Sequence, residues 1–229
     1  MNLRLLITGT DTGVGKTRVT CLLAQGLRDL GRSVWLHKPV VSGRNPDGSF
    51  DDVVALQQQA AADQPVASVA PCTVPEPASP HLAARLAGVP LDMQRYRQAL
   101  AAVDGDHDLL VEGVGGVLVP ITDALETIID FAKPAALRPL VVARPHLGTL
   151  NHSALTVAAL RQAGLEPLGL VVNHHEQISP SVATTTAAEE LTRITGLPVL
   201  AEIPYQPDAT VAIALATAVY ARSKAPTCS

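Results

Sequence analysis

Short apolar runs alternate along this chain with longer segments of helical periodicity. The apolar runs predict strands at residues 3–8, 33–40, 108–116, 139–144, 168–173 and 198–204. These runs are apolar on both faces, so each strand needs cover on both sides, which a parallel sheet between two layers of helices provides. The alternation therefore predicts an α/β fold with a doubly wound, mainly parallel sheet and helices on both faces.

The segments between these strands predict the helices. Residues 16–30 carry apolar side chains at helical spacing and stop at Gly31. Further helices are expected at 123–136, 151–163, 180–195 and 209–221, the last so apolar that it suits core packing or a subunit interface. Residues 43–104 are rich in Pro, Ala and Gln and predict loops and short helices of the same domain. We expect one domain over 1–221 and a short flexible tail at 222–229.

Composition excludes several classes of protein. Hydrophobic residues make up 47% of the chain, enough for a sizeable core, while the net charge of −4 and 3% aromatic content argue against nucleic-acid binding. No stretch approaches the ~20 apolar residues of a membrane span, and the N-terminus lacks the apolar region of a signal peptide. The three cysteines are too far apart in sequence to form a metal knuckle. A cytoplasmic protein with no membrane or nucleic-acid partner is expected.

The stretch ITGTDTGVGKT, residues 7–17, follows the first predicted strand directly. Small residues let backbone N–H groups converge on an anion, and the helix that follows adds its positive N-terminal end. Lys16 would reach the β- and γ-phosphates, and the Thr17 hydroxyl would ligate Mg²⁺. Thr10 stands where a P-loop has its first glycine. The context still favours a P-loop NTPase-like fold over an ordinary glycine-rich turn, and a dinucleotide fingerprint would not need the lysine and threonine.

One more lysine and three acids are candidates for the same edge of the sheet. Lys38 ends the second predicted strand and is either a site residue or a solvated cation. Glu112 ends the third strand beside glycines, where it is a metal ligand or a turn partner. Asp51 and Asp52 begin a helix, where either acid is a metal ligand or an N-cap.

The chain resembles the dethiobiotin synthetase family. The matching pieces are TGTDTGVGKT, KPVVSG, DDVVALQ, PASPH, VEGVGG, LGTLNH, VVN and EIPY, in the family's order from residue 8 to about 205. The resemblance implies that ATP and Mg²⁺ are used to join CO₂ to 7,8-diaminopelargonate and close a ureido ring. The steps implied are capture of CO₂ as a carbamate, attack of the carbamate on the γ-phosphorus, and closure of the ring with loss of phosphate.

Roles follow residue by residue from that resemblance. Lys38 and Lys16 are the implied catalytic cations, and Thr12 and Ser42 would hydrogen-bond the carbamate end of the substrate. The implied magnesium ligands are Thr17, Asp52 and Glu112, Asp52 being preferred to Asp51 on its spacing to ALQ. The implied nucleotide-binding residues are Gly13, Val14, Gly15, Lys16, Thr17, Arg18, Asp52, Glu112, Gly113, Val114, Gly115, Asn173, His174, Pro204, Tyr205 and Gln206.

The motif LGTLNH implies a site for the substrate carboxylate. Gly148, Thr149, Leu150 and Asn151 open a helix whose N–H groups would bind an anion. In the family this loop reaches the partner's substrate, which implies a homodimer with active sites at the interface. Three positions depart from the family pattern: Gly13 and His174 replace acids, and Val114 replaces alanine. The pair His174 and His175 resembles a metal pair, although adjacent histidines after a strand are usually loop residues.

Two rival functions fit the same fold. A cobyrinate-type amidating ligase would need a glutaminase domain with a nucleophilic cysteine, for which 229 residues leave no room. A partner-regulated ATPase switch usually has a lysine early in its phosphate loop, where this chain has Thr10 and Asp11.

Overall fold

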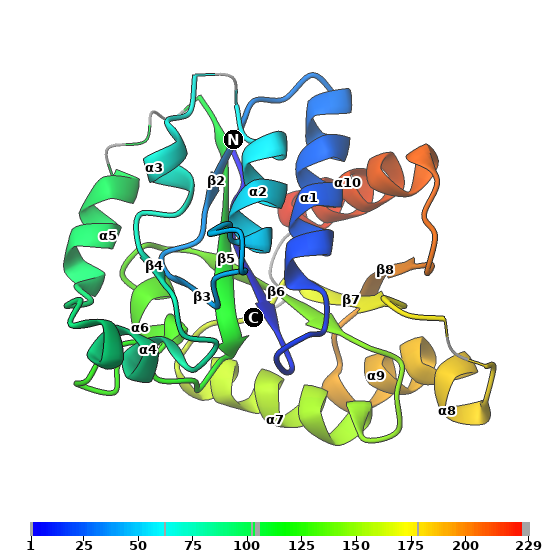
Figure 1. The fold of residues 1–229 in the computed structure, drawn as a ribbon. Coiled ribbons are helices and arrows are strands. Elements are labelled where there is room, and N and C mark those ends of the chain that lie inside the picture. The colour runs from blue at the N-terminus through cyan, green and yellow to red at the C-terminus, as the bar shows by residue number, and fades with distance from the viewer. Residues whose placement is uncertain (1, 62, 102, 104–105, 178, 226–229) are drawn as a thin grey trace.

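A six-stranded parallel sheet forms the centre of the molecule (Figure 1). The computed structural model describes residues 2–61, 63–101, 103, 106–177 and 179–225. In spatial order the strands are β2 (Val34–His37), β5 (Asp108–Gly116), β1 (Arg4–Gly9), β6 (Arg138–Ala143), β7 (Gly169–Asn173) and β8 (Val199–Ile203). Each neighbouring pair is parallel, which confirms the predicted sheet and all six predicted strands.

Helices cover both faces of this sheet (Figure 1). Strand β1 is buried on both sides because Leu6 enters one core, whereas Leu5 and Ile7 enter the other. The Leu5 core is completed by α1 (Lys16–Asp29), α2 (Asp51–Gln59), α3 (Val66–Val69) and α10 (Ala209–Lys224). The Leu6 core is completed by α4 (Pro80–Ala87), α5 (Met93–Ala101), α6 (Ile128–Ala132), α7 (Thr149–Gln162) and α9 (Ala187–Thr195). The doubly wound α/β architecture is therefore confirmed.

Helices α1 and α10 pack closely against each other. A Cβ on Gly26 of α1 would lie 2.0 Å from the carbonyl oxygen of Ala212 in α10, so this approach requires glycine. Leu215, Ala216 and Val219 of α10 are buried, as the core-packing interpretation of this segment predicts. The helix continues through Lys224, so the predicted tail begins later than residue 222; residues 226–229 lie outside the described part of the chain.

The region after β2 adds a small second sheet at the edge of the site. Strand β3 (Val41–Ser42) pairs in parallel with β4 (Thr73–Val74), a pairing that the sequence did not predict. The rest of the region consists of loops and the short helices α2 to α5, as expected. No helix in the described residues has both the length and the apolar character needed to span a bilayer.

Two predicted helices are shorter than their patterns indicate. Helix α6 covers only Ile128–Ala132 of the predicted 123–136, because Thr127 and Asp130 form a capping box that starts the helix there, and Pro134 follows its end. The predicted helix at 180–195 is divided into α8 (Val182–Thr185) and α9. Ser181 and Thr184 form a capping box that starts α8, and Thr186 is the residue between α8 and α9.

Candidate active site

The glycine-rich loop joins β1 to α1 at the carboxyl edge of the sheet. Gly13 and Gly15 have φ of 73° and 86°, left-handed values that favour glycine. Gly15 is the N-cap of the 14-residue helix α1. The first N–H groups of such a helix have no partner within it and lie at the positive end of the helix dipole. The loop therefore has the geometry that the sequence predicted for an anion-binding site.

A fixed contact between Gly15 and Asn173 holds the loop against β7. A Cβ on Gly15 would lie 2.1 Å from Nδ2 of Asn173, so no other residue fits. The same Nδ2 donates a hydrogen bond of 2.9 Å to the carbonyl oxygen of Val14. Val14 itself is fully buried, so its side chain belongs to the core and does not face a ligand.

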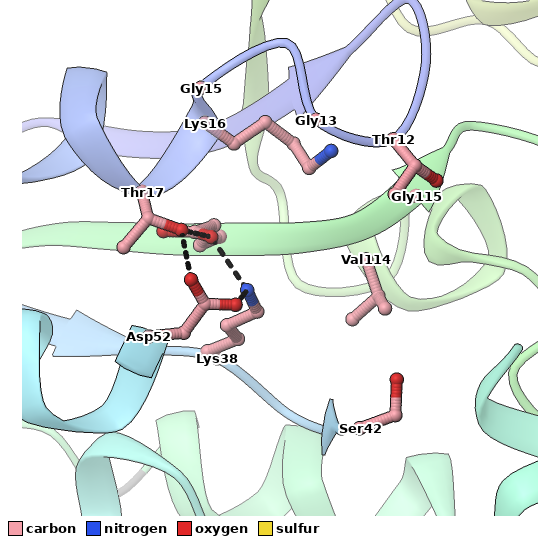
Figure 2. Close-up of a pocket in the computed structure, with 11 residues that line it drawn as sticks. Thr12, Gly13, Gly15, Lys16, Thr17, Lys38, Ser42, Asp52, Val114 and Gly115 are labelled. Carbon is pink, nitrogen blue, oxygen red and sulfur yellow. Dashed lines mark hydrogen bonds and ion pairs between the residues drawn. The ribbon is translucent and has the colours of Figure 1, made fainter. Parts of the chain in front are cut away.

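A cavity of about 340 Å³ lies between this loop and strands β2 and β5 (Figure 2). Lys16 folds back over the loop, and its Nζ donates to the carbonyl oxygen of Asp11 at 3.0 Å. Most of the predicted phosphate, metal and carbamate residues meet here. The lining residues are Thr12, Gly13, Gly15, Lys16, Thr17, Lys38, Ser42, Asp52, Glu112, Val114 and Gly115.

Side chains from α1, α2, β5 and the residue that follows β2 meet in this cavity; those of Thr17, Asp52 and Lys38 are labelled in Figure 2. Oγ1 of Thr17 lies 2.7 Å from Oδ1 of Asp52 and 2.7 Å from Oε1 of Glu112. Nζ of Lys38 donates to Oε1 of Glu112 at 2.7 Å and also contacts Oδ2 of Asp52. Lys38 is therefore a buried ion-pair partner, and the alternative of a solvated cation is wrong.

Charge pairing decides the ionisation of Lys38 and Asp52. Burial alone would lower the pKa of Lys38, but the neighbouring Glu112 and Asp52 carboxylates outweigh burial and raise that pKa. Burial would likewise raise the pKa of Asp52, yet Lys38 holds it below its usual range. Lys16 has no direct carboxylate contact, and burial lowers its pKa to about 8. The site thus carries one fixed cation and one cation that titrates near neutral pH.

The oxygen atoms at this point fit a magnesium ion. Mg²⁺ prefers carboxylate, hydroxyl and phosphate oxygens, and Thr17, Asp52 and Glu112 present such oxygens within hydrogen-bond distance of one another. Among the described residues, Oε2 of the fully buried Glu112 has no hydrogen-bond partner. A buried carboxylate oxygen in this condition is costly unless a cation or water accompanies it.

The positions of the two adjacent aspartates agree with the preference for Asp52 over Asp51 as a metal ligand. Asp52 faces the cavity, whereas Oδ1 of Asp51 accepts a 2.6 Å hydrogen bond from Asn45. Neither acid caps the helix, because the N-cap is Phe50 and it makes no side-chain cap hydrogen bond. Gly113 is not among the residues that line the cavity, and a Cβ there would lie 3.4 Å from Ile128 of α6.

The guanidinium of Arg18 forms hydrogen bonds with the two segments that are predicted to bind the base. Its guanidinium donates to Oδ1 of Asn173 at 3.1 Å and to the carbonyl oxygen of His174 at 3.0 Å. It also donates to the carbonyl oxygens of Pro204 and Tyr205, both at 2.6 Å. The ends of β7 and β8 are thereby fixed beside the phosphate loop, with the exposed Gln206 following Tyr205.

A second cavity of about 440 Å³ adjoins the first one. Thr12, Ser42, Val114 and Gly115 line both cavities, so they lie at the boundary. The residues that line only the second cavity are Pro77, Ala78, Ser79, Pro80 and Val119. No role for these five was predicted, although the PASPH motif that contains four of them was part of the resemblance.

The predicted carboxylate site lies elsewhere on this copy of the chain. Gly148 caps α7 with φ 94°, and Thr149 begins the helix. In the described part of the chain, residues 148–151 do not line either cavity. The loop instead faces outward, with the side chain of Leu147 94% exposed.

Comparison with known proteins identifies the family. A family model described as an AAA domain matches residues 3–212. The ATP-dependent dethiobiotin synthetase BioD of Anaeromyxobacter dehalogenans is 42% identical over 89% of this chain and 91% of its own length. BioD 1 of Salmonella typhi is 35% identical over 90% of each chain. This chain belongs to the dethiobiotin synthetase family.

Solved structures that resemble this family member share its fold. The septum site-determining protein MinD of Pyrococcus horikoshii, complexed with Mg-ADP, aligns over 98% of both chains with a TM-score of 0.62 and 18% identity. The cobyrinic acid a,c-diamide synthase of Mycobacterium smegmatis aligns over 96% of this chain and 94% of its own with a TM-score of 0.53 and 18% identity. These likenesses confirm a P-loop NTPase-like fold.

Proposed function

We propose that the protein is an ATP-dependent cyclo-ligase that converts 7,8-diaminopelargonate and CO₂ into dethiobiotin in biotin biosynthesis. Family membership over most of the chain supports the reaction. The observation that carries the proposal is the meeting of Lys38, Asp52, Glu112 and Thr17 beside the phosphate loop, within one cavity.

The loop and Lys16 bind the triphosphate in this proposal. The N–H groups at the start of α1 donate hydrogen bonds to the phosphates, and the Lys16 ammonium offsets charge that gathers on the γ-phosphate. Burial lowers the pKa of Lys16 to about 8 in the free protein. A bound phosphate is negatively charged and therefore favours the charged form of Lys16. Arg18 holds Asn173 and the loop after β8 in place, where Asn173, His174, Pro204, Tyr205 and Gln206 would contact the base.

Thr17, Asp52 and Glu112 would hold Mg²⁺ in this site. An ion bound there with the nucleotide would supply positive charge that offsets the charge of the phosphates. Lys38 contacts the same two carboxylates, which keep it protonated, and in this proposal its ammonium would lie next to the transferring phosphoryl group.

The chemistry then depends on charge stabilisation by this chain's own residues. One amine of the substrate attacks CO₂ and loses a proton to form a carbamate. A carbamate oxygen attacks the γ-phosphorus, and the β–γ bond breaks to release ADP. The second amine attacks the carbamate carbon and expels phosphate, which closes the ureido ring. Lys38 offsets the negative charge that develops in both later steps, while Thr12 and Ser42 orient the carbamate by hydrogen bonds.

The second cavity accommodates the aliphatic chain of the diamine. Its prolines and Val119 are apolar, and its boundary residues Thr12 and Ser42 are those proposed to hold the carbamate end. The far carboxylate would bind the N-terminus of α7, at residues 148–151, from a second copy of the chain. The exposed positions of Leu147 and Leu155 on that part of the surface support a homodimer with sites across its interface.

Product analysis tests this function. The protein is incubated with 7,8-diaminopelargonate, bicarbonate and Mg-ATP, and the ureido product is measured by mass. We expect dethiobiotin and phosphate in equal amounts, with phosphate release requiring both the diamine and bicarbonate. Phosphate release of the same rate without either substrate would instead indicate an ATPase switch and contradict the proposal.

A further inference from the structure

A group of two histidines and one glutamate lies outside the active-site cavity. His146 belongs to the loop between β6 and α7, and His175 and Glu176 follow β7. Strands β6 and β7 are parallel neighbours, so the loops at their carboxyl ends lie side by side. The sequence separates His146 from the other two by nearly thirty positions, which is why no motif indicated the group.

The distances within this group are those of metal ligands. Oε1 of Glu176 lies 3.3 Å from Nε2 of His146 and 3.5 Å from Nε2 of His175. Two donors on a tetrahedral zinc ion, with bonds of about 2.0–2.2 Å, are roughly 3.3–3.6 Å apart. One ligand atom from each residue falls within 4.8 Å of the other two, so a single ion can reach all three.

Hydrogen bonding does not explain why these side chains gather. Among the described residues, Nε2 of His146 is a buried atom with no hydrogen-bond partner despite its closeness to Glu176. Nδ1 of His175 is also buried without a partner. A buried nitrogen that is left unpaired is costly, and a cation bound between Glu176 and the two Nε2 atoms would satisfy Nε2 of His146.

We propose that His146, His175 and Glu176 form a binding site for a divalent transition-metal ion of the zinc class. Two imidazoles and one carboxylate are a donor set that suits Zn²⁺, whereas Mg²⁺ prefers oxygen alone. The three ligands leave a fourth position for water. His174, which the sequence pairs with His175, is not a ligand, because its Nε2 lies 3.7 Å from Glu202 instead.

A bound ion would join two loops that border the phosphate loop. A Cβ on Gly15 would be 3.6 Å from Cβ of His175, so the proposed metal site adjoins the phosphate loop. His146 lies two residues before Gly148, the N-cap of α7. The ion would therefore hold the start of α7 against the end of β7, separately from the oxygen site at Thr17, Asp52 and Glu112.

Metal titration of the untagged full chain tests the proposal. Zn²⁺ binding is measured by calorimetry without nucleotide, and Co²⁺ is used as a probe because its visible absorption reports tetrahedral coordination. The variants are H146A, H175A and E176Q, with H174A as the matched control. Thermal unfolding of each variant shows whether it is folded.

We expect one Zn²⁺ per chain, with binding at least about tenfold weaker in H146A, H175A and E176Q and unchanged in H174A. The tetrahedral Co²⁺ spectrum should disappear in the two histidine variants. Absence of Zn²⁺ binding by the wild-type chain, or full binding by folded H146A and H175A, would overturn the proposal. Dethiobiotin formation with Mg-ATP is measured in parallel and tests the proposed function independently.

Discussion

Replacing Lys38 by methionine should strongly destabilise the protein, because it leaves Glu112 as a buried charge without its cation. The lysine side chain is 6% exposed and that of Glu112 is 0% exposed, so water cannot take the place of the ammonium. Removing one partner from a buried ion pair typically costs about 3–5 kcal/mol. Asp52 is 38% exposed and can regain solvation, so the loss is assigned mainly to Glu112.

A double-mutant cycle measures this loss by urea unfolding in the presence of EDTA. We expect K38M to lower the free energy of unfolding by about 3–5 kcal/mol, and the K38M/E112Q double variant to lose less than K38M alone. The control is R193M, which breaks the exposed pair with Glu190 and should leave the free energy of unfolding nearly unchanged, because solvent screens that pair. A K38M loss below about 1 kcal/mol, or strictly additive losses in the cycle, would refute the reasoning.

Three further predictions concern the phosphate loop and the substrate carboxylate. Gly15→Ala should lower the free energy of unfolding by about 1–3 kcal/mol and weaken nucleotide binding, because its Cβ would meet Asn173. Gly13→Ala has open space around its Cβ and should cost only about 1 kcal/mol of backbone strain, so equal effects of the two variants would argue against the Asn173 contact. The affinity for Mg-ATP, measured by calorimetry, should fall above pH 8 by up to about tenfold per pH unit, since Lys16 has a pKa of about 8 in the free protein and a bound phosphate keeps it charged. The Lys16→Gln variant should bind Mg-ATP more weakly and with almost no dependence on pH, and a flat wild-type profile would contradict the pKa of Lys16. Asn151→Ala should raise the KM for the diamine more than the KM for ATP in steady-state assays, and equal increases would count against a carboxylate site on α7.

The fold was predictable from the sequence because its signals are local. Each of the six strands is a short, mostly apolar run, and the glycine loop lies directly between a strand and a helix. Helix lengths were less predictable where side chains near a boundary intervene. The capping boxes of Thr127 with Asp130 and of Ser181 with Thr184 start α6 and α8 later than expected, and Thr186 separates α8 from α9.

The site was predictable as far as strand ends determine it. Lys38 directly follows β2, and Glu112 lies within the neighbouring parallel strand β5 rather than at its end as the sequence predicted, so their meeting follows from topology. Contacts between distant segments were not accessible in this way. The insertion of Asn173 against Gly15, and the closeness of His146 to His175, depend on how the loops after β6 and β7 turn, which no local pattern encodes.

The central claim of this account is that phosphoryl transfer in the Lys38 cavity activates captured CO₂. The most direct test uses ¹⁸O-labelled bicarbonate with 7,8-diaminopelargonate and Mg-ATP in a short incubation, followed by mass analysis of phosphate and product. We expect one ¹⁸O in the released phosphate and one in the ureido oxygen, because a carbamate oxygen attacks the γ-phosphorus and leaves with it. Unlabelled phosphate alongside labelled dethiobiotin would contradict the claim.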